Sequence, residues 1–174
     1  MGVTGVDTEG PVAIVTGAGS GIGAACATAL AARGCRVVVN YQHSREGASD
    51  IVSQCQALGV EAVSVQGSVA DDKDCRSILD ETINTFGRVD LLVNNAGVTR
   101  FADQKDLDAL DAADFEHIMS VNVAGSYQMT REAAPFLKKS DCAAVVNVSS
   151  HSGISGIGSS MAYAASKGAL NTMT

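Results

Sequence analysis

The residues of this sequence best suited to chemistry are a tyrosine and a lysine near its end. Tyr163 and Lys167 stand four positions apart in the stretch "YAASK". In a helix, residues at this spacing share a face, with Cβ atoms about 6 Å apart. An ammonium at that range stabilises a phenolate, which helps the tyrosine to give and take a proton. The pair therefore predicts a proton-transfer device, and the alternative is a surface packing or cation–π pair.

A glycine-rich turn is the second feature with chemical potential. The stretch "TGAGSGIG" places Gly17, Gly21 and Gly23 between an apolar run and a helical pattern. Glycines there let the backbone approach a pyrophosphate, and the helix N-terminus offers free N–H groups to the anion. Ala24 stands where a triphosphate-binding loop carries lysine, so a dinucleotide is favoured. The alternative is a tight turn with a purely structural role.

The elements that must position these residues follow from alternating apolar runs and helical patterns. We expect strands over residues 11–17, 36–40, 61–66, 89–94 and 143–150. We expect helices over residues 25–34, 44–58, 72–86 and 111–139, the last as one helix or two, and from Met161 onward. Apolar strands that alternate with helices are typical of a parallel sheet covered on both faces. The sequence therefore predicts a doubly wound α/β fold, with residues 1–174 as one domain.

The end of the second predicted strand bears on the choice of dinucleotide. An NAD site offers a carboxylate to the ribose hydroxyls there, but this chain has Tyr41 in "VVVNYQHSRE". Without that carboxylate a 2′-phosphate is not repelled, and His43, Ser44 and Arg45 could bind it. The cofactor expected is NADP, with NAD as the alternative, and His43 could equally be an ordinary loop residue.

Taken together, these motifs resemble the short-chain dehydrogenases/reductases. The resemblance rests on "TGAGSGIG", on "NNAG" at residues 94–97, on Asn122, on "NVSS" ending at Ser150, and on "YAASK". It implies a Rossmann-like sheet of order 3-2-1-4-5, with later strands missing from this C-terminally incomplete sequence and the fifth strand left as an open edge.

The resemblance also implies a role for each site residue. Tyr163 would be the general acid/base, Lys167 its activator and a ribose binder, Ser150 the donor that orients the carbonyl, and Asn122 the anchor of a water in a proton relay. Ser149 would lie nearer the cofactor. The expected cofactor-binding residues are Gly17, Ser20, Gly21, Ile22, Gly23, Tyr41, His43, Ser44, Ser68, Val69, Asn95, Ala96, Gly97, Tyr163 and Lys167. Ser68 is a departure, because the family usually carries there an aspartate that meets the adenine.

Charge and cysteine usage exclude several other classes of function. The net charge is −7 and no basic run occurs, which argues against nucleic acid or an anionic membrane as a partner. Five scattered cysteines, without a metal-ligand spacing, are typical of reduced thiols in a cytoplasmic protein. No metal site is expected.

The expected activity is the NAD(P)-dependent interconversion of a carbonyl and a secondary alcohol. A reductase of 3-oxoacyl thioesters carried on acyl carrier protein is one specific possibility, and a non-catalytic dinucleotide-sensing domain is the rival. The resemblance further implies a homodimer or homotetramer built on the helices around residues 123–138 and from Met161 onward.

Overall fold

The structure is a computed structural model, and it describes residues 9–174, so the first eight residues of the predicted domain lie outside the described residues. Five parallel strands form one sheet in the order β3-β2-β1-β4-β5, which confirms the predicted topology. The strands are β1 (Val12–Val15), β2 (Arg36–Tyr41), β3 (Ala62–Gln66), β4 (Leu91–Asn94) and β5 (Ala144–Asn147).

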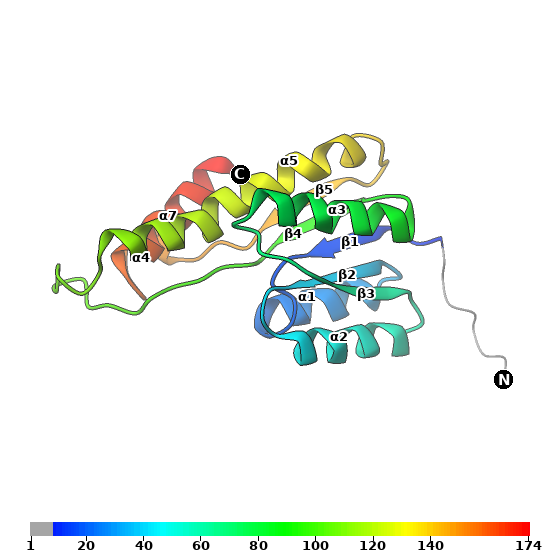
Figure 1. Ribbon diagram of the computed structural model, residues 1–174, viewed down its shortest axis with the longest axis horizontal. Coiled ribbons are helices and arrows are strands. Elements are labelled where there is room, and N and C mark those ends of the chain that lie inside the picture. Colours follow the sequence, from blue (N-terminus) through cyan, green and yellow to red (C-terminus); the bar gives the residue numbers. More distant parts are fainter. Residues whose placement is uncertain (1–8) are drawn as a thin grey trace.

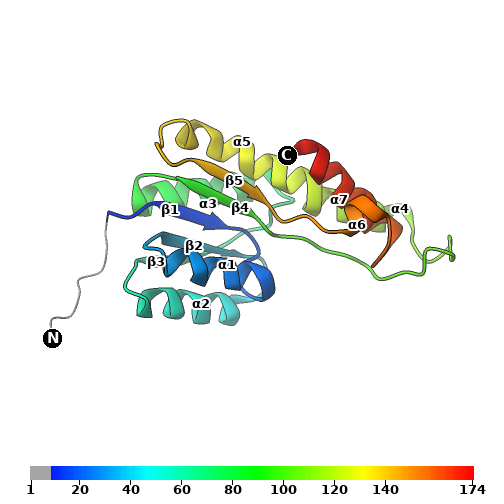
Figure 2. The same cartoon turned by 180° about the vertical axis from the view of Figure 1, so that it is seen from behind.

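Helices cover both faces of the sheet (Figures 1 and 2). The helices α1 (Gly21–Ala31) and α2 (Arg45–Ala57) pack on one face. On the other face lie α3 (Asp72–Phe86) and α5 (Ser126–Leu137). Because the strands are parallel, the turns that lead from strands into helices all lie at the carboxyl end of the sheet. Ligands of open parallel sheets bind at this end.

Side-chain alternation along the strands divides the core into two apolar clusters. On β2, Val38 belongs to the cluster under α3 and α5, whereas Val37 and Val39 belong to the cluster under α1 and α2. Both faces of β2 are buried, which is why its sequence reads as an apolar run without a polar face.

Three predicted helix ends can be checked against the backbone. α3 begins after Asp71, whose carboxylate accepts the N–H groups of Lys73 and Asp74, and it ends at Gly87 with φ 74°. Both features are favoured at helix ends. Ser44 precedes α2 as expected, but its side chain makes no capping hydrogen bond.

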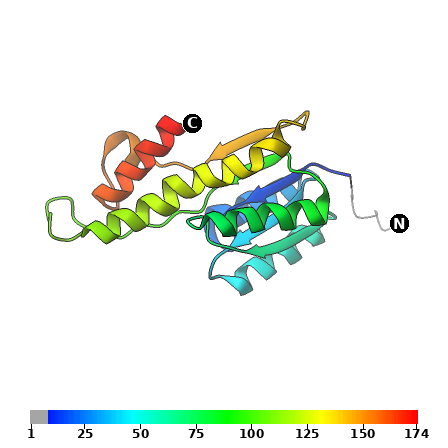
Figure 3. The same ribbon diagram turned by 45° about the horizontal axis from the view of Figure 1, so that its top comes forward.

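The long helical stretch predicted over residues 111–139 contains a π-helical segment. α4 (Ala112–Met119) continues into η1 (Ser120–Gly125) and then into α5. α7 (Met161–Met173) lies beside this stretch (Figure 3). A four-residue helix, α6 (Ser152–Ser155), precedes α7 in a segment for which no helix was predicted.

β5 forms one edge of the described sheet. Its Val145 and Val146 are 38% and 51% exposed, in contrast to the buried strands β1 and β2. Within residues 9–174, no helix has the length and apolar character needed to cross a membrane.

Candidate active site

The glycine turn between β1 and α1 is held tightly against the segment that follows β4. Gly17 has φ 62°, a backbone conformation that disfavours any residue with a side chain. A Cβ at this position would also lie only 2.9 Å from the Cα of Ala96. Asn95 Nδ2 donates to the carbonyl oxygens of Thr16 at 2.9 Å and Gly17 at 3.1 Å. The turn and the "NNAG" segment therefore form one rigid unit.

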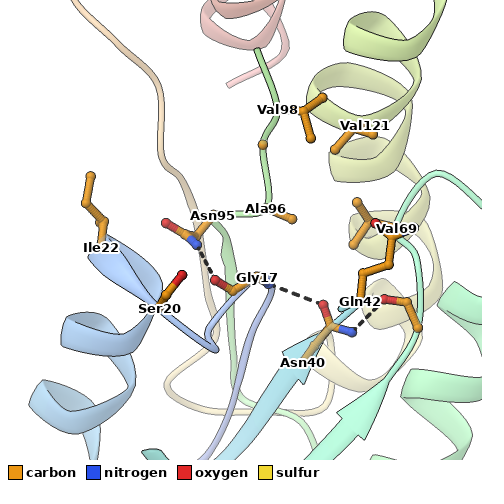
Figure 4. A pocket seen from close by; sticks show the side chains of 12 residues that line it. Gly17, Ser20, Ile22, Asn40, Gln42, Val69, Asn95, Ala96, Val98 and Val121 are labelled. Atoms are coloured by element: carbon orange, nitrogen blue, oxygen red, sulfur yellow. Dashed lines mark hydrogen bonds between the residues drawn. The ribbon is translucent and has the colours of Figure 1, made fainter. Parts of the chain in front are cut away.

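A cavity of about 330 Å³ opens above this turn (Figure 4). It is lined by Gly17, Ser20, Ile22, Asn40, Gln42, Gly67, Val69, Asn95, Ala96, Gly97, Val98 and Val121. None of these described lining residues is acidic. α1 begins beside the cavity with no acidic residue in its first turn, and the Ser20 side chain makes no capping bond. The site therefore fits the phosphates of a dinucleotide.

The end of β2 differs from the prediction made for Tyr41. This residue is only 5% exposed, belongs to the cluster under α1 and α2, and its Oη accepts a hydrogen bond from Arg45 Nε at 3.3 Å. Tyr41, His43 and Ser44 do not line the cavity, whereas Asn40 and Gln42 do. Alternation explains the difference, because Tyr41 shares a face of the sheet with Val39.

Asn40 ties the glycine turn to the end of β3. Its Oδ1 accepts the N–H of Gly17 at 3.3 Å, and its Nδ2 donates to the carbonyl oxygen of Gly67 at 3.0 Å. Beyond β3, Val69 lines the cavity as expected, but Ser68 does not. Ser68 Oγ accepts the N–H of Ala70 at 3.3 Å and thereby stabilises the turn that contains it.

Tyr163 and Lys167 line a second cavity, of about 300 Å³. It shares Ile22, Asn95, Gly97 and Val98 with the first cavity, so the two cavities are adjacent. Lys167 Nζ lies 5.7 Å from the centre of the Tyr163 ring, and the two predicted partners are therefore together.

Lys167 is held by the segment that follows β5. Its Nζ donates to the carbonyl oxygen of Val148 at 2.7 Å, and its own carbonyl oxygen accepts from Ser149 Oγ at 3.3 Å. The residue is only 4% exposed, and burial lowers the pKa of its ammonium from the ordinary 10.5. The ammonium thus has a fixed place beside the tyrosine.

Asn122 lies in η1 and is fully buried. Its Oδ1 accepts the N–H of Val98 at 2.8 Å, and its Nδ2 donates to the carbonyl oxygen of Val98 at 3.0 Å and to Ser166 Oγ at 2.9 Å. The side chain thus binds the segment after β4 on one side and α7 on the other.

The two serines after β5 take different positions. Ser149 lines the second cavity, and Ser150 is not among the lining residues. Ser150 Oγ accepts the N–H of Ser152 at 3.2 Å. Since that bond uses an acceptor site of the hydroxyl, its O–H remains able to donate.

Several lining residues come from loops that the sequence analysis did not assign. Thr99, Phe101 and Ser159 line the second cavity. The hydroxyls of Thr99 and Ser159 are in contact, and the N–H of Ala102 donates to the carbonyl oxygen of Ser159 at 3.3 Å. Ser159 has φ 62°, which is unusual for a residue other than glycine and which no sequence pattern indicated.

The five cysteines were predicted to be reduced thiols without metal-ligand spacing. All five cysteines are free thiols, and burial raises the pKa of Cys75 to about 12. Among the residues that the structure describes, no group of three or more His, Cys, Asp or Glu side chains is placed to hold a metal ion.

A doubly wound sheet with a glycine turn beside a Tyr/Lys pair defines a dinucleotide-binding class of protein. Comparison with known proteins makes this specific. The family model described as short chain dehydrogenase matches residues 11–174. The chain therefore belongs to the short-chain dehydrogenase family.

Individual relatives agree with this assignment. Versicolorin reductase 1 of Aspergillus parasiticus is 38% identical over 164 residues, which cover 94% of this chain and 61% of the relative. The chain thus spans less than two thirds of that protein. A crystal structure from Burkholderia xenovorans, described as a short-chain dehydrogenase/reductase, matches with a TM-score of 0.92 and 42% identity over 95% of this chain and 70% of that one. NAD⁺-bound xylitol dehydrogenase matches with a TM-score of 0.86 and 30% identity over 94% and 62% of the two chains.

Proposed function

We propose that the protein is an NADP-preferring oxidoreductase that interconverts a carbonyl and a secondary alcohol. The observation that carries this proposal is that the cavity beside the glycine turn and the cavity beside the Tyr163 and Lys167 pair are adjacent and share four lining residues. A dinucleotide whose phosphates lie at Gly17 can extend past Asn95 and Gly97 toward that pair. When bound, its nicotinamide supplies or accepts the hydride.

The side chains around the second cavity supply the proton chemistry. In reduction, Tyr163 Oη gives its proton to the carbonyl oxygen of the substrate, and the Lys167 ammonium stabilises the phenolate that remains. Ser150 is not among the residues that line this cavity, but its O–H can donate, and the resemblance assigns it a hydrogen bond to the same carbonyl oxygen. Asn122 is assigned to the proton relay, in keeping with the resemblance and with its place beside α7.

The preference for NADP rests on the charge of the first cavity. Gln42 and Asn40 are neutral, and the exposed residues His43 and Ser44 follow directly. No carboxylate among the described lining residues would repel a 2′-phosphate.

A steady-state comparison tests both parts of the proposal. Oxidation of NADPH and NADH is followed with the natural full-length protein over a panel of ketones that includes a 3-oxoacyl thioester. We expect turnover, with kcat/KM at least about tenfold higher for NADPH. Binding of NADPH without turnover of any ketone would instead support a dinucleotide sensor, and a preference for NADH would refute the cofactor assignment.

A single charge change sharpens the cofactor test. Gln42→Glu places a carboxylate in the first cavity, so we expect it to weaken NADPH more than NADH. Gln54→Glu makes the same charge change at an exposed position of α2 outside the cavity and is the matched control. Equal effects of both variants would count against the placement of the ribose near Gln42.

The proposal extends to assembly and location. We propose a homodimer or homotetramer in the cytoplasm, built on α5 and α7, whose Tyr127 and Met161 are 55% and 46% exposed. Light scattering of the full-length protein tests the assembly, and a monomer would refute it.

A further inference from the structure

Ser166 is a buried polar residue of α7 that the proposed mechanism does not use. It lies between Tyr163 and Lys167 in the chain, and it is fully buried. Its hydroxyl donates to the carbonyl oxygen of Tyr163 at 2.7 Å and accepts from Asn122 Nδ2 at 2.9 Å. One hydroxyl thus joins the helix that carries the candidate acid to the π-helical segment.

The connection continues from Asn122 to the wall of both cavities. Both polar atoms of the Asn122 side chain bind the backbone of Val98, at 2.8 and 3.0 Å, and Val98 lines both cavities. The path from Val98 through Asn122 and Ser166 to Tyr163 therefore consists of hydrogen bonds between buried or half-buried groups. Such networks fix one arrangement, because a buried group that loses its partner is costly.

This chain of hydrogen bonds restricts the rotation of α7 about its own axis. Successive residues of a helix are turned by about 100°, so residues 163 and 166 point about 60° apart and move together when the helix rolls. A bond from Ser166 to Asn122 therefore limits the roll that would swing the Tyr163 side chain within the second cavity.

Thr172, on the same helix, has a hydroxyl whose hydrogen bond stays within α7 and provides a comparison. Thr172 Oγ1 donates to the carbonyl oxygen of Gly168 at 3.2 Å and is exposed. Its hydrogen bond stays within α7, whereas the Ser166 hydroxyl also binds a second segment. The backbone bond alone does not explain why Ser166 faces inward.

We propose that Ser166 is a positioning residue that holds Tyr163 in its reactive place by locking α7 to Asn122. The inference rests on the proposed function, since it concerns the same proton transfer. It assigns Ser166 no contact with substrate or cofactor.

The variant Ser166→Ala tests this role in the natural full-length protein. It removes one hydroxyl with little change in volume and leaves an Asn122 N–H without its partner. We expect kcat to fall about tenfold or more, because small misplacements of a reacting group are costly. The dissociation constant of NADPH and the KM of the ketone should stay within about twofold. Thr172→Val is the control and should keep the kcat of the wild type.

The outcome separates positioning from mere structural support. A purely structural role would lower the folded fraction and scale kcat with it, so kcat is expressed per folded molecule, counted by NADPH titration. If Ser166→Ala does not fold, Ser166→Cys serves, with a weaker hydrogen-bonding group of similar size. A wild-type kcat per folded molecule in the variant that folds would overturn the inference. Absence of turnover in the wild type, or activity in Tyr163→Phe, would instead refute the proposed function itself.

Discussion

The contact between α6 and α7 gives the sharpest structural prediction, at Gly153. A Cβ on Gly153 would lie 2.6 Å from the carbonyl carbon of Lys167 and 2.8 Å from the N–H nitrogen of Gly168. Both neighbours are backbone atoms of a packed helix, so neither can rotate away. To move from 2.6 Å to the ordinary contact of 3.4 Å, α6 must retreat from α7 by about 0.8 Å.

That retreat acts on the candidate catalytic lysine. Gly153 follows the segment whose Val148 carbonyl accepts from Lys167 Nζ at 2.7 Å and whose Ser149 donates to the Lys167 carbonyl at 3.3 Å. A shift of this size lengthens both contacts. Overpacking of this kind costs about 1–3 kcal/mol of stability. A displacement near 1 Å in an active site can reduce the rate about 100-fold.

The assay compares Gly153→Ala with Gly59→Ala, a glycine substitution that creates no close contact. Gly59 has φ 90° and no atom within 4 Å of an added Cβ, so Gly59→Ala should lose stability through backbone strain alone. We expect kcat/KM per folded molecule to fall strongly for Gly153→Ala and to stay near wild type for Gly59→Ala. Equal activity in the two variants would refute the reasoning that α6 positions Lys167.

Three further predictions concern the frame around the site. Burial alone would raise the pKa of Asp90, but hydrogen bonds from Arg88, Ser140 and the N–H of Val12 outweigh it and hold that pKa below the ordinary 3.8. The stability that Asp90 contributes is therefore complete above pH 3.8, and it is lost as the pH falls through the lower pKa of the folded state. The free energy of unfolding of Asp90→Asn, measured in urea, should therefore depend less on pH in that acid range than that of the wild type. Gly17→Ala should weaken NADPH binding at least about tenfold in a fluorescence titration while the protein stays folded, and unchanged binding would contradict the phosphate assignment. Asp71→Ala removes the cap of α3 and should cost about 1 kcal/mol in a denaturation curve, with kcat unaffected.

The sequence predicts most of the frame because its signals are local. Apolar runs and helix-ending glycines such as Gly87 act over a few residues, and each predicted strand is present in the predicted order. The spacing of Tyr163 and Lys167 also predicts that the two side chains lie together, since one helix carries both and both line the second cavity.

The features that the sequence did not predict depend on contacts between distant segments. The π-helical segment spans only six residues, Ser120–Gly125, which is too short to show a period of its own, so only its hydrogen bonds reveal it. Gly153 of α6 packs against the backbone of Lys167 in α7. Ser159 has a positive φ in a loop that is hydrogen-bonded to the segment of residues 99–102. The burial of Tyr41 could have been predicted from the sequence. Side chains alternate along a strand, so Tyr41 shares the buried face of Val39, and Gln42 lies at the cavity.

The most direct measurement of the central claim is the rate of carbonyl reduction by Tyr163→Phe. This change removes one hydroxyl from the second cavity and leaves the first cavity intact. We predict that reduction is lost, by about 1,000-fold or more in kcat, while the dissociation constant of NADPH stays within about twofold. Retention of wild-type kcat would contradict the assignment of Tyr163 as the proton donor.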